Sequence, residues 1–398
     1  MVRSAVRRLL TLPTNPPDTL RRGPFRAGAF RSALHEERIA SILGLALGVT
    51  FTVCFATGVY SHLVQHPPSW FQNPARPAGL YRVTQGLHVA TGLASIPLLL
   101  AKLWVVYPHL WKWPPIQDLL HALERISLLP LVGGSIFMLF TGLANTGGWY
   151  PWRFFFPAGH YWGAWITMGA LIVHIGAKAS IVARSLRRDS LDVVAEPGRG
   201  LTRRGFLGVV AATSGIVTLT TLGQTFRPLD RLALLAPRRP GVGPQGFPIN
   251  KSAASARVLE LARDPSYRLE VSGDVARSLS LSLDDLRSLS QHEATLPIAC
   301  VEGWSAEAHW RGVRIEELLN LAGADPDSEI TVESLQPRGL YRASVLNPAH
   351  ARDPDTLLAL GVNGSPLHID HGFPARLIAP NNPGVMQTKW VHRLTVRA

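Results

Sequence analysis

Five long apolar runs within the first 225 residues constrain this 398-residue chain more than any other feature. Each approaches the roughly 20 residues that an α-helix needs to cross a bilayer. Charged residues are scarce inside the runs and gather at their ends. Because the connectors are short, neighbouring runs are expected to pack antiparallel. The sequence therefore predicts an all-α bundle of five transmembrane helices in contact with membrane lipid, over residues 39–63, 83–107, 126–143, 161–182 and 205–223.

The distribution of Lys and Arg predicts how these helices are oriented. Residues 1–38 contain eight arginines, and seven basic residues flank the loop between the fourth and fifth runs, whereas the loops after the first and third runs hold three together. Cytoplasmic loops of membrane proteins are enriched in Lys and Arg. The amino terminus is therefore expected in the cytoplasm, and a fifth crossing places the carboxy-terminal part on the exterior face. This topology accounts for the net charge of +13 without a nucleic-acid partner, since no basic and aromatic residues interleave as in a binding groove.

The fifth run begins with Thr202-Arg203-Arg204-Gly205-Phe206-Leu207, which resembles a twin-arginine export signal of the bacterial cell membrane. Its Ala-, Gly- and Thr-rich core is only weakly apolar, as in such signals. The alternative is an ordinary positive-inside anchor that happens to contain two arginines. The export machinery would carry a domain that folds around its cofactor in the cytoplasm, and we expect that domain to stay tethered because no clear cleavage site follows the run.

The rest of the chain reads as an ordinary globular domain. Short β-like runs at 267–271 and 329–332 mix with helical pieces at 283–289 and 315–321, which indicates an α+β fold. The predicted organisation is a basic cytoplasmic tail (1–38), a four-helix membrane domain (39–185), a twin-arginine-like loop with the fifth helix (186–226), a linker rich in Pro, Gly and Arg (227–250) and an α+β domain (251–398).

Histidines inside apolar runs are functional candidates by default. His88 lies in the second run and His174 in the fourth, and this pair is the deepest candidate for bis-histidine ligation of haem b. His62 and His160 lie near the outer ends of their runs and are candidate ligands of a second, outer haem, in which either His62 or His88 would pair with His160. His160 and His174 are separated by about 21 Å of helical rise, which suits two stacked haems. Alternatively, His62 and His160 are interfacial residues hydrogen-bonded at headgroup level. The first four runs resemble four-helix b-type cytochromes, and the resemblance implies one or two haems b and a quinone or quinol partner.

The chain has two cysteines, and Cys54 lies inside an apolar run. They provide no disulfide framework, no c-type haem attachment motif and no ligand set for an iron–sulfur cluster. Cys300 ends a short apolar segment in the sequence Pro-Ile-Ala-Cys-Val-Glu-Gly-Trp-Ser, residues 297–305. A thiolate at this position is a ligand for a soft metal, and the simpler alternative is a small buried hydrophobe.

Two ordered blocks around Cys300 resemble the molybdenum-cofactor domain of the sulfite-oxidase family, and within it the bacterial periplasmic methionine-sulfoxide reductases. The first block continues into Trp310-Arg311-Gly312-Val313, and the second runs through Val362-Asn363-Gly364 and His371-Gly-Phe-Pro-Ala-Arg376 to Lys389-Trp390. The resemblance covers residues 245–398. It implies that Cys300 binds molybdenum and is catalytic, that Arg376 and Lys389 bind the phosphate end of molybdopterin, that His371 and Asn363 add hydrogen bonds, and that Tyr341 places a catalytic hydroxyl near the metal. Alternatively, Arg376 and Lys389 are exposed strand charges and Tyr341 packs in the core.

The residues after Cys300 bear on the substrate. Relatives that oxidise sulfite have a basic run there, whereas this chain has Val301-Glu302-Gly303-Trp304. We therefore expect a neutral, polarisable small molecule such as an S-oxide or N-oxide, reduced with electrons that pass from quinol through haem b to molybdenum. One alternative is the reverse direction, oxidation of a sulfite-like substrate with electrons passed to quinone. Another is a cofactor-free sensor or assembly module anchored in the membrane.

Overall fold

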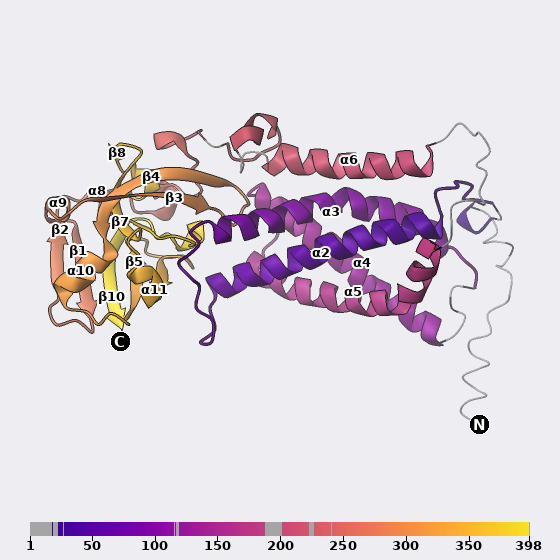
Figure 1. Ribbon diagram of the computed structural model, residues 1–398, viewed down its shortest axis with the longest axis horizontal. Helices are drawn as coiled ribbons and strands as arrows, with labels where there is room; N and C mark the ends of the chain where they lie inside the picture. The colour runs from indigo at the N-terminus through magenta and orange to yellow at the C-terminus, as the bar shows by residue number, and fades with distance from the viewer. Residues whose placement is uncertain are drawn as a thin grey trace, which may run out of the picture. The chain divides into compact units, whose positions relative to one another are not determined.

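The computed structural model describes residues 18, 23–26, 28–114, 116, 119–187, 201–222, 227–239 and 241–397 (Figure 1). Much of the predicted basic tail and of the 186–226 loop lies outside these ranges. The chain divides into two compact units. The first contains residues up to 56 together with 88–219, and the second contains 57–87 together with 220–398. Three of the long helices contribute residues to both units.

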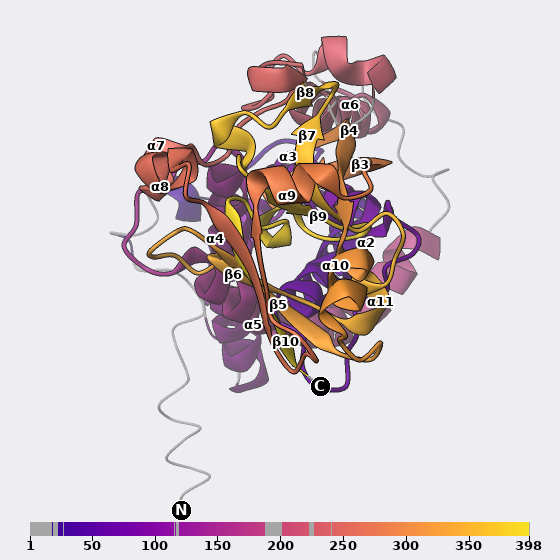
Figure 2. The same cartoon turned by 90° about the vertical axis from the view of Figure 1, so that its left-hand side faces the viewer.

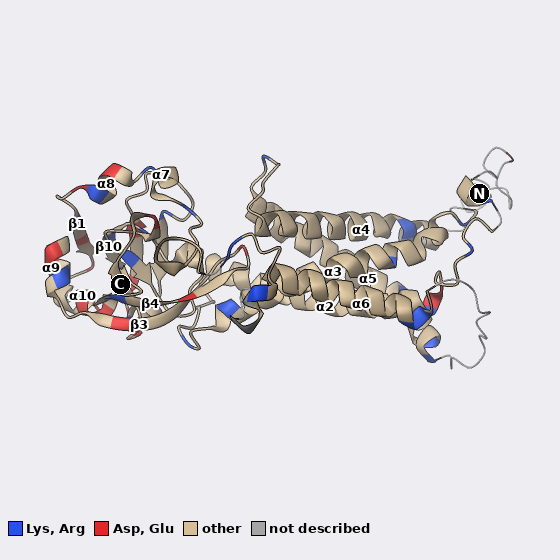
Figure 3. Cartoon of the chain, turned by 90° about the horizontal axis from the view of Figure 1, so that it is seen from above, with Lys and Arg blue, Asp and Glu red and all other residues tan. Residues whose placement is uncertain are grey.

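All five predicted membrane helices are confirmed among the described residues, and each extends beyond its apolar run. Every one is long and apolar enough to cross a membrane by length and composition. Figure 3 shows them almost free of charged residues along their lengths. The helices are α2 (Glu37–Gln65), α3 (Leu80–Leu110), α4 (Leu119–Thr146), α5 (Phe156–Arg187) and α6 (Arg203–Leu222).

Small and hydroxyl-bearing residues bring the helices of the first unit together. At Gly134 of α4, an added Cβ would lie 2.3 Å from Oγ1 of Thr167 on α5, so only glycine permits this approach. The fifth helix is part of the same packing. Val210 of α6 is buried in a cluster with Ile39 of α2 and Val105 of α3.

The second unit contains two β-sheets, and its α+β class is confirmed (Figure 2). The first sheet has the strand order β2-β1-β10-β5-β6, in which β1 and β10 are parallel. The second has the order β3-β4-β7-β8, with β9 also paired to β7. The strands are β1 (Arg268–Gly273), β2 (Leu279–Ser282), β3 (His292–Ala299), β4 (Ser305–Arg314), β5 (Glu329–Ser334), β6 (Ala343–Leu346), β7 (Leu357–Val362), β8 (Ser365–Pro366), β9 (Arg376–Ile378) and β10 (Val391–Arg397).

Short helices cover the sheets of the second unit. The predicted helical pieces appear as α9 and α10, and both have clear termini. Ser282 and Asp285 form a capping box at the start of α9, and Gly323 ends α10 in the left-handed conformation. One face of α10 is buried in the core of the first sheet. The described helices of this unit are α7 (Ala253–Ala256), α8 (Leu259–Arg263), α9 (Leu283–Ser288), α10 (Ile315–Ala322) and α11 (Pro348–Ala351), with 3-10 turns at Arg227–Leu232, Pro244–Gly246, Ile369–His371 and Gly384–Met386.

A separate apolar cluster lies at the second sheet, and it places Cys300 in the core. Leu296 and Ile298 of β3 and Trp310 of β4 are at most 4% exposed, and Cys300 is 2% exposed beside them. Phe247 joins this cluster. The end of the predicted linker is therefore part of the folded domain.

Candidate active site

A tight hairpin between β3 and β4 positions Cys300. The Cys300 amide donates to the Trp304 carbonyl at 2.9 Å, and the Gly303 amide donates to the Cys300 carbonyl at 3.0 Å. Gly303 has a φ of 94°, which favours glycine. Glu302 accepts a hydrogen bond from Nε1 of Trp304 at 3.1 Å and lies 3.6 Å from Nε of Arg238. The turn residues after the cysteine are thus fixed by one another and by the linker.

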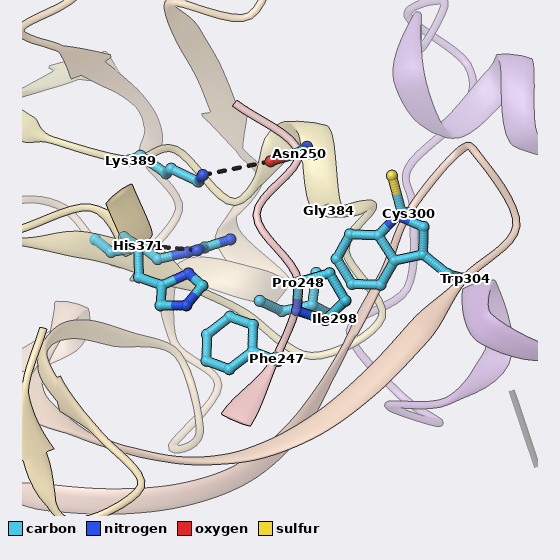
Figure 4. A pocket seen from close by; sticks show the side chains of 10 residues that line it. Phe247, Pro248, Asn250, Ile298, Cys300, Trp304, His371, Gly384 and Lys389 are labelled. Atoms are coloured by element: carbon cyan, nitrogen blue, oxygen red, sulfur yellow. Dashed lines mark hydrogen bonds between the residues drawn. The ribbon is translucent and has the colours of Figure 1, made fainter. Parts of the chain in front are cut away.

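Cys300 lies at one end of a hollow in the second unit. Figure 4 shows its sulfur and Trp304 on one side, with His371 and Lys389 on the other and Phe247 and Pro248 between them. The hollow joins segments far apart in the sequence. It is lined by Phe247, Pro248, Asn250, Ile298, Cys300, Trp304, His371, Arg376, Gly384 and Lys389.

Two cations lie at the end opposite Cys300. Arg376 is 2% exposed, so the alternative of an exposed strand charge is wrong for this residue. Its Nη1 donates to the His371 carbonyl at 3.0 Å, and its Nε has no partner among the described residues. Lys389 donates to the carbonyls of Asp370 and Lys251 at 2.8 and 2.9 Å. Within the described ranges, no carboxylate comes within ion-pair distance of either cation.

Burial makes both charges costly. It lowers the pKa of Arg376 from 12.5 to about 9, and it lowers the pKa of Lys389 well below its usual value, with a further contribution from the charge of Arg376. Buried charges are normally paired. Two desolvated cations beside one hollow, with no carboxylate of the described residues at ion-pair distance, fit an anionic ligand such as a phosphate group.

His371 contributes a buried hydrogen-bond acceptor to the cation end of the hollow. Its ring stacks on Phe247 with centroids 3.8 Å apart, and its Nε2 lies 2.7 Å from the carbonyl oxygen of Pro244. Because that oxygen can only accept, Nε2 carries the proton and Nδ1 is left as an acceptor. Nδ1 is buried without a partner in the described chain. Burial lowers the pKa of His371 to about 3, so the ring stays neutral.

Comparison with known proteins identifies the domain that contains this hollow. The model of a family described as the oxidoreductase molybdopterin binding domain matches residues 256–398. Residues 256–398 form an oxidoreductase molybdopterin-binding domain. We refer to this part as the molybdopterin domain.

Three relatives carry names that bear on the assignment. A putative protein-methionine-sulfoxide reductase subunit YedZ1 of Azospira oryzae is 35% identical over 150 residues, 38% of this chain and 56% of the relative. Mouse mitochondrial sulfite oxidase is 34% identical over 163 residues, 34% of this chain and 30% of the relative. The protein-methionine-sulfoxide reductase catalytic subunit MsrP of Xanthomonas campestris is 32% identical over 157 residues, 36% of this chain and 48% of the relative. The chain thus spans between about a third and just over half of these relatives.

Two predicted site residues of the molybdopterin domain lie outside the lining of the hollow. Asn363 is exposed in the turn between β7 and β8, where its side chain donates to the Gln245 carbonyl at 2.7 Å and accepts from the His309 amide at 3.0 Å. Tyr341 donates its hydroxyl hydrogen to Oε1 of Gln65 at 3.1 Å, and burial raises its pKa. Asn363 therefore orders a turn, and Tyr341 connects the domain to a preceding segment.

The sequence analysis did not single out several residues of the lining. Phe247, Pro248 and Asn250 belong to the predicted linker, where Pro and Gly conceal any pattern of burial. Gly384 comes so close to β3 that an added Cβ would lie 3.1 Å from both the Ala299 carbonyl and the Ile298 side chain. The Pro383-Gly384 pair is the sequence feature that could have indicated the close approach of Gly384 to β3, since such pairs mark turns.

The contacts of the membrane histidines differ from the pairing of His88 with His174, which their depth in the apolar runs favoured. In the first unit, the His88 and His160 rings lie 6.3 Å apart at their centroids. His88 Nδ1 lies 2.8 Å from the Cys54 carbonyl, and His160 Nδ1 lies 3.0 Å from the hydroxyl of Thr141. His174 is about 21 Å further along α5 by helical rise. In the second unit, His62 stacks on the next histidine along α2, His66, at 4.8 Å.

Proposed function

We propose that this chain is a membrane-bound molybdenum enzyme that takes electrons from quinol through haem b and reduces an S-oxide or N-oxide on the exterior face. The observation that carries the proposal is that the two ends of the hollow differ in their ionisable groups. A buried thiol lies at one end, and two cations without carboxylate partners lie at the other. An elongated cofactor with a metal at one end and a phosphate at the other matches this arrangement.

Four residues of the hollow would hold that cofactor. Cys300 would bind molybdenum as the thiolate, and Arg376 and Lys389 would bind the phosphate. His371 presents Nδ1 as an acceptor for an N–H group, because its Nε2 proton already faces Pro244. The bound cofactor supplies two-electron oxygen-atom transfer. Burial, together with the nearby charge of Glu302, raises the pKa of Cys300 to about 12, so metal binding must release the thiol proton.

The turn after Cys300 supports a neutral substrate. Glu302 is held by Trp304 and Arg238, so the position that is basic in sulfite-oxidising relatives here carries a paired carboxylate. Reduction of a sulfoxide consumes two electrons and two protons and releases a sulfide and water. Two of the relatives named above are described as protein-methionine-sulfoxide reductase subunits.

Turnover of the detergent-purified chain in both directions tests the substrate class. Reduced viologen with methionine sulfoxide, or with trimethylamine N-oxide, measures reduction, and sulfite with ferricyanide measures oxidation. We expect oxide reduction to exceed sulfite oxidation by at least tenfold in kcat/KM. Sulfite oxidation as the faster reaction would overturn the proposed direction, and the Cys300→Ala variant provides the background rate.

The remaining parts of the proposal concern the membrane helices. The contact between His88 and His160 favours these two residues as ligands or neighbours of one haem, with His174 at the depth of a second. The amino terminus is placed in the cytoplasm and the molybdopterin domain outside. Lys and Arg at the predicted inner ends of the helices support this orientation.

Substitution of Arg203 and Arg204 tests the hypothesis that α6 begins with a twin-arginine export signal. Arg203 forms an ion pair with Glu36 at 2.9 Å, and the Ser214 hydroxyl donates to the Ala94 carbonyl on α3 at 3.0 Å, which supports α6 as a retained helix. Replacement of both Arg203 and Arg204 by lysine keeps the charge for the ion pair but removes the arginine pair. We expect the variant to insert its first four helices and to leave the molybdopterin domain in the cytoplasm, as measured by protease protection in spheroplasts. Normal export would favour the simple anchor.

A further inference from the structure

Residues 57–87 belong to the same compact unit as the molybdopterin domain, and the first two turns of α3 contact the residues that flank Cys300 in sequence. Tyr81 is 1% exposed and packs in one cluster with Ala299. Gln85 is 5% exposed, and its Nε2 donates to the Val301 carbonyl at 3.0 Å. Residues four apart share a helix face. One face of α3 therefore contacts the residues immediately before and after the cysteine.

Asn381 fastens this part of the chain to the domain. It is 3% exposed and lies in the turn before Gly384. Its Oδ1 accepts from the Tyr81 amide at 2.6 Å, and its Nδ2 donates to the Pro74 carbonyl at 2.7 Å. The Tyr81 amide is in the first turn of α3, where backbone donors have no acceptor within the helix. A side chain about 300 residues away in sequence thus caps α3 and fixes its start against the domain.

An ion pair provides a second attachment. Nε and Nη2 of Arg76 each lie 2.8 Å from a carboxylate oxygen of Asp353, and Nη2 lies 2.5 Å from Asp355. The Asp353 side chain is only 7% exposed. A bidentate ion pair of this kind fixes the orientation of the two side chains as well as the distance between them. The 57–87 segment is therefore held at several separate points.

A chain of hydrogen bonds also connects Tyr341 to Tyr81. Tyr341 donates to Oε1 of Gln65, and Nε2 of Gln65 donates to the Ser61 hydroxyl at 3.1 Å. The Ser61 hydroxyl lies 3.0 Å from the hydroxyl of Tyr81. The Tyr81 hydroxyl in turn lies near enough to Cys300 for their charges to interact. The polar groups around the thiol thus come from both the segment and the domain.

We propose that Gln85 is a positioning residue of the molybdenum site, which holds the Cys300 hairpin from α3. The carbonyl of Val301 can only accept, so it fixes the Gln85 amide with Nε2 toward the hairpin, and Oε1 is buried without a partner in the described chain. Val301 directly follows the proposed metal ligand. The hydrogen bonds within the hairpin join Cys300, Gly303 and Trp304, and the Gln85 bond adds a contact from α3 that orients the Val301 peptide beside the thiolate.

This inference rests on the proposed function only for the metal bound by Cys300. A site on the molybdopterin domain would then depend on a membrane helix that also carries His88, one turn beyond Gln85. The start of α3 thus supports the Cys300 hairpin as well as beginning a membrane helix.

The test compares Gln85→Leu and Gln85→Asn with the matched control Thr84→Val in the full chain. Leucine removes the donor at similar size, asparagine keeps the amide but shortens its reach, and the Thr84 hydroxyl bonds only to carbonyls of α3 itself. In cofactor-free protein, iodoacetamide labelling of Cys300, resolved from Cys54 by peptide mass spectrometry, should be about tenfold faster in both Gln85 variants. Opening of the hairpin would cause this increase.

In cofactor-loaded protein, the thiolate-to-molybdenum absorption and the Mo(V) paramagnetic resonance should shift. The kcat should fall about 10- to 100-fold, because small misplacement of a reacting group has effects of this size, with KM within about twofold. Labelling and spectra equal to those of Thr84→Val would overturn the inference, whatever the Gln85 variants do to activity. A wild-type chain that turns over no oxide would refute the proposed substrate but would leave the labelling and spectral comparisons unaffected.

Discussion

Replacement of Arg376 by methionine should stabilise the empty molybdopterin domain and prevent its loading. Methionine approximates the length of the side chain but carries no charge. The folded, cofactor-free domain holds the Arg376 guanidinium away from water without a carboxylate partner in the described chain. Stability and cofactor binding are therefore expected to change in opposite directions.

The magnitude follows from the pKa. A fall from 12.5 to about 9 corresponds to about 5 kcal/mol against the charged form. The folded pKa is depressed for a cation, so this cost is fully present below pH 9 and is relieved as the pH rises from 9 toward 12.5. Methionine removes the cost but loses the hydrogen bond to the His371 carbonyl and the contact with the Trp310 ring at 5.4 Å, which together are worth about 2 to 3 kcal/mol. The net gain is about 2 kcal/mol.

Hydrogen exchange of β9 and β10 amides in the cofactor-free full chain measures this gain. At pH 7 we expect exchange about 30-fold slower in Arg376→Met than in the wild type. Added inorganic phosphate should slow exchange in the wild type and not in the variant. Arg393→Met is the matched control, because Arg393 is exposed on β10 and paired with Glu270 at 2.8 Å. It should gain no stability and should keep its molybdenum.

Faster exchange in the empty Arg376→Met chain would refute the reasoning, since the buried charge would then have a partner. Normal molybdenum content in this variant would refute the phosphate role of Arg376. The two outcomes are independent. The first concerns the folded domain alone, and the second concerns its ligand.

Three further predictions follow from the same structure. Cys300→Ala should lower oxide turnover by more than about 100-fold through loss of the metal ligand, measured with reduced viologen and related to molybdenum content. Burial lowers the pKa of His371 to about 3 and that of His350 to about 4, below the usual 6.5, so the unfolded domain binds more protons in that window. Hydrogen exchange should show stability falling from about pH 6.5 to about pH 4, by at most about 1.4 kcal/mol per pH unit for each histidine, and no change in that range would refute it. His88→Met and His160→Met should each lower the haem content in a pyridine haemochrome assay, with molybdenum retained, and full haem in both would remove them as ligands.

Features with a local pattern were predictable from the sequence. The membrane helices are visible as apolar runs because a bilayer imposes a minimum length. Cys300, His371, Arg376 and Lys389 do line one hollow, as their order in two short motifs indicated. These residues lie on adjacent strands and turns of one domain. Resemblance to a family that has this domain therefore predicts that they lie close together.

Features that depend on distant partners were not predictable. Nothing around Gln85 or Asn381 in the sequence indicates a partner more than 200 residues away. The depths of the histidines along their helices differ from the sequence estimate for a simpler reason. The apolar runs begin at 83 and 161, whereas α3 begins at Leu80 and α5 at Phe156. By helical rise, His88 is about 12 Å, His160 about 6 Å and His174 about 27 Å from the start of its helix, which accounts for the contact between His88 and His160.

The content of molybdenum and iron per chain tests the central claim most directly. The measurement is made on detergent-purified protein from a host that makes the cofactor and exports folded proteins. The account predicts about one molybdenum per chain together with one or two haem irons. Absence of molybdenum from such protein would contradict it and would favour a membrane-anchored binding module in place of an enzyme.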